Sequence, residues 1–336
     1  MRIKVLKYQI KYFFKKLSIS KLVNFIGLYI SYIIAKISIR VVNRNMPYSI
    51  SIEPTNYCNL SCPECPSGNK SLTRSRGYMS LNLFKQIIDK QYKKLINLVL
   101  YFQGEPYICK DFINMIEYAE QKNIYVITST NGHFLDDETA KRTVVAGLDK
   151  LIISMDGTEQ ESYATYRKGG DLEKVKTGIS NIVKWKQKLK SAKPFIELQF
   201  LVFRHNEEQI EEIRRFARVS CVDKLTLKNV QIYNLSEAEK LLPKDIKYSR
   251  YIKDVDGVYK LKRKQKNSCF RLWSSAVISW DGKVLPCCFD KDAKYCFGDL
   301  NSEEFEQIWH SERYKSFRKK VFHNRRQIDI CRNCTE

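Results

Sequence analysis

The sequence predicts an α/β fold in which a parallel sheet is covered by helices. From Pro47 onward, β-like runs alternate with helical stretches, and six such units follow one another along the chain. The composition agrees, because 43% hydrophobic and 29% charged residues over 336 positions are typical of a globular protein with a sizeable core. We therefore expect one large α/β domain and one smaller domain.

The predicted strands are short and rich in β-branched or aromatic residues. They cover residues 49–53, 98–102, 125–129, 150–154, 195–202 and 224–227. The predicted helices have apolar residues at helical spacing and cover 81–96, 111–122, 136–146, 172–189 and 207–219. Ser80 and Asp136 stand at expected N-cap positions, where a side-chain oxygen can accept a hydrogen bond from a free backbone N–H.

Residues 1–45 form a basic extension ahead of this pattern. Its longest uncharged run, residues 22–35, is shorter than the ~20 residues that span a bilayer. No small-residue cleavage site follows the run, so a signal peptide is not expected. Apolar residues recur there at helical spacing, which leaves two interpretations open: a helix packed against the rest of the protein, or a basic amphipathic helix lying in a membrane interface.

The net charge of +22 favours an anionic partner, namely nucleic acid, a membrane surface or a phosphorylated substrate. The lysines are spread over the whole chain, so the charge alone does not identify the partner. The eleven cysteines are an odd number in a long chain and cluster at metal-ligand spacings. That pattern indicates metal binding in an intracellular enzyme rather than a disulfide scaffold.

The first cysteine motif, Cys58-x3-Cys62-x2-Cys65, follows the first predicted strand. Thiolates are the usual protein ligands of iron–sulfur clusters, and three of them leave the fourth iron of a cubane open. An open metal position is what a catalytic metal site requires. The alternative is a structural zinc site, which needs four ligands, and no fourth Cys or His lies near this loop in the sequence.

Polar motifs follow the ends of later strands. Strand two ends in Gln103-Gly104-Glu105-Pro106, and strand four ends in Ser154-Met155-Asp156-Gly157. Arg167 follows, although it could be a surface arginine, and Gln199 lies on strand five. Each motif alone is weak, as is the turn signature Thr130-Asn131-Gly132. Their order at successive strand ends carries the weight, since the carboxyl ends of parallel strands meet at one edge.

The second cysteine set lies near the carboxyl terminus. Trp280–Lys283 predicts a hairpin turn between strands 277–279 and 284–286, and a helix is predicted over 303–322. Cys287 follows Gly282 by five positions, and Cys288 is its main rival as a ligand. Together with Cys269, Cys331 and Cys334 it could equally close around zinc. Three cysteines are predicted to be ordinary small buried residues: Cys109, Cys221 and Cys296.

The C-x3-C-x2-C motif after the first strand resembles the signature of the radical S-adenosylmethionine (radical SAM) superfamily. The carboxyl-terminal set resembles the SPASM/Twitch auxiliary-cluster domain. The resemblance implies a partial (β/α)6 TIM-type barrel followed by a small α+β domain. It implies that SAM chelates the open iron of a [4Fe–4S] cluster held by Cys58, Cys62 and Cys65. The sequence has Glu64 where many relatives have an aromatic residue.

The resemblance also implies roles for the strand-end residues. Gly104 and Glu105 match a G-G-E-P motif that contacts the SAM amino group, with Gln103 in place of the first glycine. Ser154 and Asp156 match positions near the SAM ribose and carboxylate. Arg167 is a candidate partner of the SAM carboxylate, and Gln199 is a candidate cofactor-facing residue. One auxiliary [4Fe–4S] cluster would be held by Cys269, Cys287, Cys331 and Cys334, since the sequence ends two residues later. No acid–base residue is assigned.

The expected function is that of a radical SAM oxidoreductase: the reduced cluster cleaves SAM to a 5′-deoxyadenosyl radical, which abstracts hydrogen from an unidentified substrate. Oxidation of a sugar, a lipid-linked or another small molecule is one interpretation, and peptide or protein maturation is its alternative. A zinc-stabilised basic nucleic-acid-binding protein is the alternative from another class, although no nucleic-acid-reading module is recognisable. The expected domains are 1–45 (extension), 46–230 (barrel), 231–268 (linker) and 269–336 (SPASM/Twitch-like).

The expected partners are a substrate and an electron donor such as flavodoxin or ferredoxin, and binding of nucleic acid is not expected. Iron–sulfur assembly predicts a cytoplasmic protein. The extension at residues 1–45 leaves open a peripheral position at the inner face of the membrane.

Overall fold

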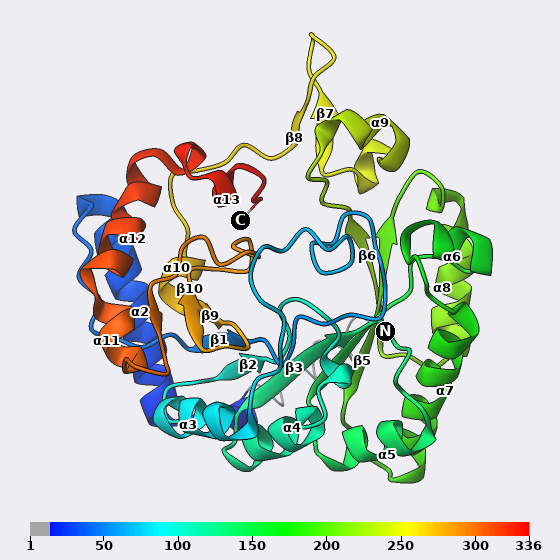
Figure 1. The fold of residues 1–336 in the computed structure, drawn as a ribbon, viewed down its shortest axis with the longest axis horizontal. Helices are drawn as coiled ribbons and strands as arrows, with labels where there is room; N and C mark the ends of the chain where they lie inside the picture. Colours follow the sequence, from blue (N-terminus) through cyan, green and yellow to red (C-terminus); the bar gives the residue numbers. More distant parts are fainter. Residues whose placement is uncertain (1–13, 336) are drawn as a thin grey trace.

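The computed structural model describes residues 14–335, and one nine-stranded sheet runs through them (Figure 1). In chain order its strands are β1 Ser49–Ile52, β2 Asn97–Val99, β3 Tyr125–Thr130, β4 Lys150–Ser154, β5 Phe195–Val202, β6 Lys224–Asn229, β9 Ser275–Ile278, β10 Lys283–Leu285 and β11 Gly298–Asp299. The strand order in the sheet is β11-β10-β9-β1-β2-β3-β4-β5-β6. Strands β1 to β6 pair in parallel with their successors, which is the order of a partial barrel built from β/α units.

Helices cover the outside of this curved sheet (Figure 1). They are α3 Leu81–Gln91, α4 Phe112–Gln121, α5 Asp137–Val145, α6 Gln160–Tyr166, α7 Leu172–Lys188 and α8 Ile210–Val219. The predicted N-caps are confirmed, because Ser80 accepts a hydrogen bond from Leu83 N and Asp136 accepts one from Thr139 N. The predicted α/β fold with a parallel sheet is therefore confirmed.

The carboxyl-terminal segment joins the same sheet. Strand β9 pairs in parallel with β1 and forms the predicted hairpin with β10. The single helix predicted over 303–322 is wrong, because two helices, α11 Phe305–His310 and α12 Glu312–Asn324, occupy this stretch. Ser311 between them has extended backbone and caps α12 by accepting a hydrogen bond from Tyr314 N. Ser311 therefore ends α11 and begins α12, because its hydroxyl bonds to the backbone of the second helix.

The segment predicted as a linker has structure of its own. It contains the short helix α9 Ala238–Leu241 and an antiparallel hairpin of β7 Tyr251–Lys253 and β8 Tyr259–Leu261. The hairpin projects from the molecule at the top of Figure 1. After it the chain returns to α10 Arg271–Ser274 and β9, and it ends with α13 Asp329–Arg332.

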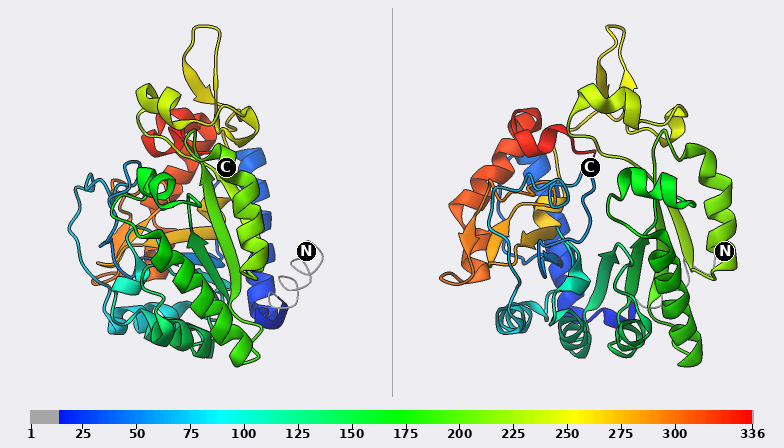
Figure 2. Two further views of the ribbon diagram at one scale, coloured as in Figure 1. Left: turned by 90° about the vertical axis from the view of Figure 1, so that its right-hand side faces the viewer. Right: turned by 45° about the vertical axis from the view of Figure 1, so that its right-hand side comes forward.

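Helix α2, Ile19–Ser38, crosses the amino-terminal ends of three strands. Lys21 donates a hydrogen bond to the carbonyl of Asn123, just before β3. Asn24 exchanges two hydrogen bonds with the backbone of Met46, just before β1. Tyr32 packs against Trp273, just before β9. Figure 2 (left) shows α2 in deep blue at one edge of the molecule and the light-blue loop after β1 at the opposite edge.

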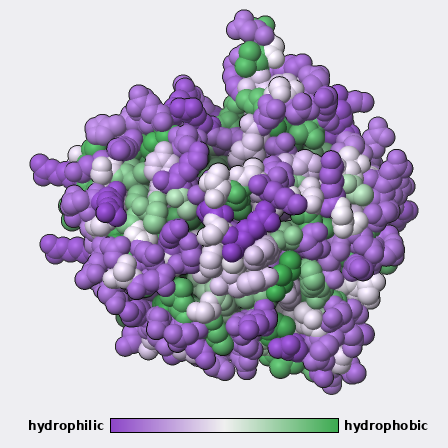
Figure 3. All heavy atoms as spheres, in the orientation of Figure 1, coloured by the Kyte–Doolittle hydropathy of each residue, from purple (hydrophilic) through white to green (hydrophobic). Residues whose placement is uncertain are grey.

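The helix is packed against the protein, but through its polar and small residues. Its buried residues are Lys21, Asn24, Leu28, Ser31 and Ala35. Seven aliphatic side chains face outward and are between 47% and 84% exposed: Ile19, Leu22, Val23, Ile26, Ile30, Ile34 and Ile37. Phe25 and Ile33 are half-buried. By length and composition alone α2 could cross a bilayer. The opposite face of the molecule, seen in Figure 3, is mainly hydrophilic.

Candidate metal centres

The loop that follows β1 carries Cys58, Cys62 and Cys65. All three thiols are free; Cys62 is buried, and the other two are half-buried. Burial raises the pKa of Cys58 to about 12 and that of Cys62 to about 11; the Cys65 thiol adds to both rises, and the Cys62 thiol adds to that of Cys58. Three thiols of one short loop therefore lie within electrostatic reach of one another in a partly dehydrated site.

Neighbouring strand ends hold this loop in place. Ser61 N donates a hydrogen bond to the carbonyl of Lys168 (2.9 Å). Asn131, after β3, donates to Asn59 Oδ1 (2.7 Å) and lies 4.0 Å from Cys58 Sγ. Gly104 has φ +73°, and a Cβ there would lie 2.5 Å from the carbonyl oxygen of Tyr57. Glycine is therefore required where strand two meets the cysteine loop.

Glu105 is the buried anchor between β2 and β3. Its carboxylate accepts hydrogen bonds from Thr130 Oγ1 (2.8 Å), Asn131 N (2.7 Å) and Tyr107 N (3.2 Å). Burial raises the pKa of Glu105 to about 7, against these hydrogen bonds. The predicted role of Glu105 toward the SAM amino group stays a prediction, and the structure adds a positioning role, because Asn131 touches both Glu105 and the cysteine loop.

The predicted residues on β4 and β5 lie side by side. Ser154 and Gln199 are register partners at neighbouring positions of the two strands. Asp156 is fully buried and accepts hydrogen bonds from Arg167 Nε (2.6 Å) and Leu201 N (2.7 Å). Arg167 is not a surface arginine, since its side chain is 14% exposed. It also interacts with the Cys62 thiol, whose pKa it lowers against the effect of burial.

A buried ion pair that the sequence did not indicate joins the cysteine loop to the carboxyl-terminal hairpin. Arg74 donates two hydrogen bonds, of 2.5 and 2.6 Å, to the carboxylate of Glu53 at the end of β1. Arg74 Nε also donates to the carbonyl of Lys291 (2.9 Å). Trp280 N donates to Glu53 Oε2 (3.2 Å). The two cysteine-bearing regions are thus fixed to each other through one carboxylate.

The four carboxyl-terminal cysteines of the predicted auxiliary site are brought together. Burial raises the pKa of Cys269, Cys287 and Cys331. Neighbouring thiols add to these rises: Cys288, Cys269 and Cys331 at Cys287, and Cys334 at Cys269 and Cys331. The guanidinium of Arg325, which is 1% exposed, donates to Cys334 Sγ (3.0 Å). A buried cation beside four thiols suits a site that becomes negative when the thiols lose their protons.

The remaining cysteines divide into different environments. Cys288 also lies near the site: after burial, its thiol contributes most to raising the pKa of Cys287, and it accepts a hydrogen bond from Arg271 (3.2 Å). The choice of Cys287 over Cys288 as the cluster ligand therefore stays a prediction. Cys109 is buried as predicted. The prediction is wrong for Cys221 and Cys296, which are exposed. Cys221 lies in a turn after α8 with φ 55°, and Cys296 lies in the loop before β11, so neither belongs to the core.

The donor sets fit iron–sulfur clusters. The first loop offers three thiols and leaves one coordination position for another ligand, and the second set offers four thiols. Among residues 14–335, no group of three or more Cys, His, Asp or Glu side chains closes around a single metal ion. Structural zinc needs a closed set of four ligands, and the first loop offers three thiols, so its donor set fits a cluster with an open position better than zinc.

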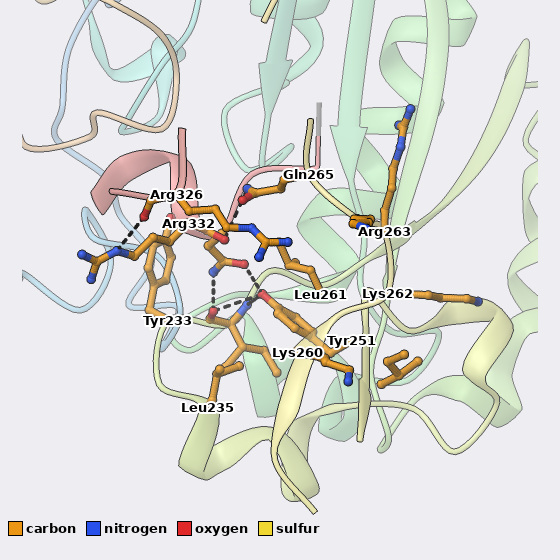
Figure 4. Close-up of a pocket in the computed structure, with 14 residues that line it drawn as sticks. Tyr233, Leu235, Tyr251, Lys260, Leu261, Lys262, Arg263, Gln265, Arg326 and Arg332 are labelled. Carbon is orange, nitrogen blue, oxygen red and sulfur yellow. Dashed lines mark hydrogen bonds between the residues drawn. The ribbon is translucent and has the colours of Figure 1, made fainter. Parts of the chain in front are cut away.

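The linker lines a cavity of about 840 Å³ that sequence reasoning missed (Figure 4). Basic side chains from residues 260–264 and from the last turns of the chain surround it: Lys260, Lys262, Arg263, Lys264, Arg326 and Arg332. Gln265 ties this segment to the auxiliary site by donating to the carbonyls of Cys331 and Cys334. The dense basic run 260–266 is the sequence feature that could have indicated this cavity. It does not stand out, because the whole chain is rich in lysine and arginine.

Comparison with known families gives two matches. A model of the radical SAM superfamily matches residues 52–217, and a model of the SPASM iron–sulfur cluster-binding domain matches residues 269–335. These matches decide against the zinc-stabilised nucleic-acid-binding interpretation, because together they account for both cysteine sets.

Individual relatives agree with these matches. The chain is 29% identical over 302 residues, 80% of this chain and 82% of the relative, to the tungsten-containing aldehyde ferredoxin oxidoreductase cofactor-modifying protein of Pyrococcus furiosus. It is 23% identical over 296 residues, 85% of this chain and 91% of the relative, to the S-adenosyl-L-methionine-dependent 2-deoxy-scyllo-inosamine dehydrogenase of Niallia circulans. The fold resembles Streptococcus suis SuiB bound to S-adenosylmethionine (TM-score 0.61, 14% identity), covering 86% of this chain and 72% of that one.

Proposed function

The chain belongs to the radical SAM superfamily and carries a carboxyl-terminal SPASM domain, and on that premise we propose that it oxidises a small, non-peptide substrate by net removal of two electrons. When bound, SAM and the two clusters supply a 5′-deoxyadenosyl radical that abstracts hydrogen and an acceptor for the second electron. The observation that carries the proposal is the pairing of a three-thiol loop with an open position and a separate four-thiol site fixed to it through Glu53.

The residues of the chain hold and orient these groups. Cys58, Cys62 and Cys65 ligate three irons of the SAM cluster, and Gly104 lets strand two approach the loop. Arg167, held by Asp156, presents a cation for the SAM carboxylate. Ser154 and Gln199 line the cofactor side of the barrel, and Glu105 fixes the loop and faces the SAM amino group. The auxiliary cluster is a single [4Fe–4S] cluster ligated by Cys269, Cys287, Cys331 and Cys334.

We divide the chain into a barrel over residues 46–230, a structured connection over 231–268 and a SPASM domain from residue 269, with residues 1–45 as an extension. The second domain is continuous with the first through the pairing of β9 with β1. The oxidative interpretation is supported by the dehydrogenase relative, which aligns over 85% of this chain. The alternative, modification of a peptide or protein, remains the second candidate for the same chemistry.

An electron-transfer protein with an acidic surface, such as a flavodoxin or a ferredoxin, docks at the cavity of Figure 4. The support is charge complementarity, because six basic residues line this cavity and no acidic residue among those described does. Gln265 places the cavity next to the backbone of Cys331 and Cys334. The reduction rate should fall steeply with ionic strength if this is the docking surface.

The protein lies at the inner face of the membrane, with α2 in the interface. An amphipathic helix binds there through its apolar face and basic flanks, and α2 exposes such a face while Lys36, Arg40 and Arg44 lie around it. The wild-type protein should bind to vesicles of anionic phospholipid, and the triple variant Ile26→Ser/Ile30→Ser/Ile34→Ser should not. The matched control is Val145→Ser/Val219→Ser, which changes exposed apolar residues on α5 and α8.

Formation of 5′-deoxyadenosine from SAM tests the central proposal. Anaerobically reconstituted, dithionite-reduced protein should form it, and a Cys58→Ala/Cys62→Ala/Cys65→Ala variant should not. Iron analysis separates loss of the SAM cluster from loss of both clusters. Protein that contains zinc and no iron, and forms no 5′-deoxyadenosine, would overturn the proposal.

A further inference from the structure

A second cavity, of about 640 Å³, lies at the amino-terminal ends of β1, β2 and β9, between α2 and residues 263–271. This volume lies within the range of small-molecule sites. Arg263 and Lys264 line both this cavity and the one in Figure 4, so the two lie on either side of this segment. None of the predicted SAM-binding residues lines it, and of the auxiliary ligands only Cys269 does.

Positive charge dominates the lining of this cavity. Its cations are Lys36, Arg263, Lys264, Lys266 and Arg271, and none of the described residues that line it is acidic. Lys36, Lys264 and Lys266 form no ion pair or side-chain hydrogen bond within residues 14–335. Cations gathered in a confined space repel one another unless an anion joins them. The cavity therefore suits a ligand that carries more than one negative charge.

The uncharged lining supplies hydrogen-bonding groups. Ser275, Ser49 and Asn97 occupy one row across β9, β1 and β2, because Ser49 is the register partner of both of the other residues. Asn97 Nδ2 donates to Ser49 Oγ (2.7 Å). Ser51 and Tyr48 also line the cavity. Hydroxyl and amide groups beside cations match the many acceptor oxygens of a phosphate or diphosphate ester.

The cavity is lined by strands that run to the predicted radical site. Ser51 and Val99 are register partners on β1 and β2, and both line it. Ser51 stands two residues, or about 7 Å of strand, before Glu53, where the strand ends and the cysteine loop begins. Cys269 in the wall places the auxiliary site beside the same space. A ligand anchored here can thus extend along the inside of the sheet toward the strand ends.

The opposite end of the cavity reaches α2. Tyr32 and Lys36 line it. Lys36 lies between buried Ala35 and exposed Ile37, so helical spacing places it on the flank between the packed strip and the outward apolar strip. The basic mouth of the cavity therefore opens beside the apolar face of α2. A molecule with an apolar tail on that face would bring its phosphate to Lys36.

We propose that this cavity binds the phosphate or diphosphate group of the substrate, with the part to be oxidised extending into the barrel. The inference rests on the proposed function for the statement that the ligand is the substrate; the anion site itself stands on the lining residues. Two sources carry this chemistry, a lipid-linked phosphate held in the membrane and a soluble phosphate ester.

Inorganic pyrophosphate is the first probe, and isothermal titration calorimetry on the reconstituted, full-length protein measures its affinity. We expect pyrophosphate to bind to the wild type and to bind at least ten times more weakly to Lys36→Gln/Lys266→Gln, which changes two lysines that line this cavity and not the one in Figure 4. The matched control is Lys319→Gln/Lys320→Gln, which removes two adjacent exposed lysines on α12 and should bind as the wild type does. Thermal unfolding of each variant checks that it is folded.

Farnesyl diphosphate in solution is the second probe and separates the two sources. Tighter binding of this ester than of pyrophosphate, with the difference abolished by Ile26→Ser/Ile30→Ser/Ile34→Ser, supports the lipid-linked source. Equal binding of both probes supports a soluble phosphate ester. The site is overturned if folded wild-type protein binds neither probe, or if Lys36→Gln/Lys266→Gln binds both as well as wild type does. SAM cleavage by the wild type is measured in a separate assay. A failure of the anion site can therefore be told apart from a failure of the proposed radical chemistry.

Discussion

Glu53 and Arg74 form a buried two-point ion pair that holds the first cysteine loop against the carboxyl-terminal hairpin. Removing one partner leaves an uncompensated buried charge, which costs about 3–5 kcal/mol. We expect Arg74→Met to lower the free energy of unfolding by that order, measured by denaturant titration. Arg76→Met, at an exposed position in the same loop, is the control and should have little effect. Equal stability of both variants would show that Arg74 is not the clamp.

Arg167 should contribute to SAM affinity, because Asp156 and the Cys62 thiol fix its guanidinium beside the cysteine loop. We expect Arg167→Gln to weaken SAM binding to the reconstituted protein at least tenfold, or by about 1.4 kcal/mol. Lys168→Gln is the matched control, since its side chain is exposed and its backbone carbonyl still holds Ser61. Unchanged SAM affinity together with a lower melting temperature would assign Arg167 a structural role alone.

Cys287 and Cys288 should differ in iron content. Both lie near the auxiliary site, but the spacing from Gly282 favours Cys287 as the ligand, and Cys288 accepts a hydrogen bond from Arg271. We expect Cys287→Ala to reduce iron from roughly eight to roughly four atoms per chain, and Cys288→Ala to keep roughly eight, as two [4Fe–4S] clusters require. Iron analysis and electron paramagnetic resonance of the reduced proteins measure this. The reverse pattern would make Cys288 the ligand.

The sequence predicted the elements where local pattern and packing agree. Strands β4 and β5 have the predicted bounds, because both are rich in apolar residues and lie largely buried in the middle of a parallel sheet. The three-thiol loop was likewise readable from spacing. The pair of Glu53 with Arg74 was not, because no periodicity links a strand end to an irregular loop that folds back on it.

The orientation of α2 could not be predicted from the sequence either. Its apolar spacing predicted an amphipathic helix but did not say which face would pack. The packed face is decided by two hydrogen bonds to backbone carbonyls elsewhere in the chain. Lys21 donates to Asn123, and Asn24 donates to Met46. Such partners are visible only after the strands that carry them are in place. The basic cavity beside α2 is built in the same way, from segments more than two hundred residues apart.

His133 should make stability depend on pH. Its Nε2 accepts a hydrogen bond from Asp171 N (2.8 Å). Burial lowers its pKa below the usual 6.5, Asn131 and Asp171 oppose this shift, and Lys174 and Arg167 add to it. As pH falls below about 6.5, the unfolded chain takes up a proton that the folded protein resists, so this contribution to stability is full above pH 6.5 and is lost on acidification. His133→Gln should reduce this loss of stability in denaturant titrations at pH values between about 8 and about 5, the range in which histidine titrates. The control His323→Gln, exposed on α12, should retain it.

Arg325 should raise the reduction potential of the auxiliary cluster. Its buried guanidinium donates to Cys334 Sγ (3.0 Å) and interacts with Cys331, and both positive charge and hydrogen bonds to sulfur stabilise the reduced, more negative state of a cluster. We expect Arg325→Gln to lower the midpoint potential by on the order of 60 mV, a tenfold change in the one-electron equilibrium. The control Arg326→Gln removes the same positive charge at the next, exposed position. It should leave the potential unchanged. Redox titration followed by electron paramagnetic resonance measures both variants. If the two variants shift the potential equally, long-range surface charge rather than the contact with Cys334 sets it, and the buried arginine then serves only to fold the carboxyl-terminal turn around Ser268, whose carbonyl it also holds.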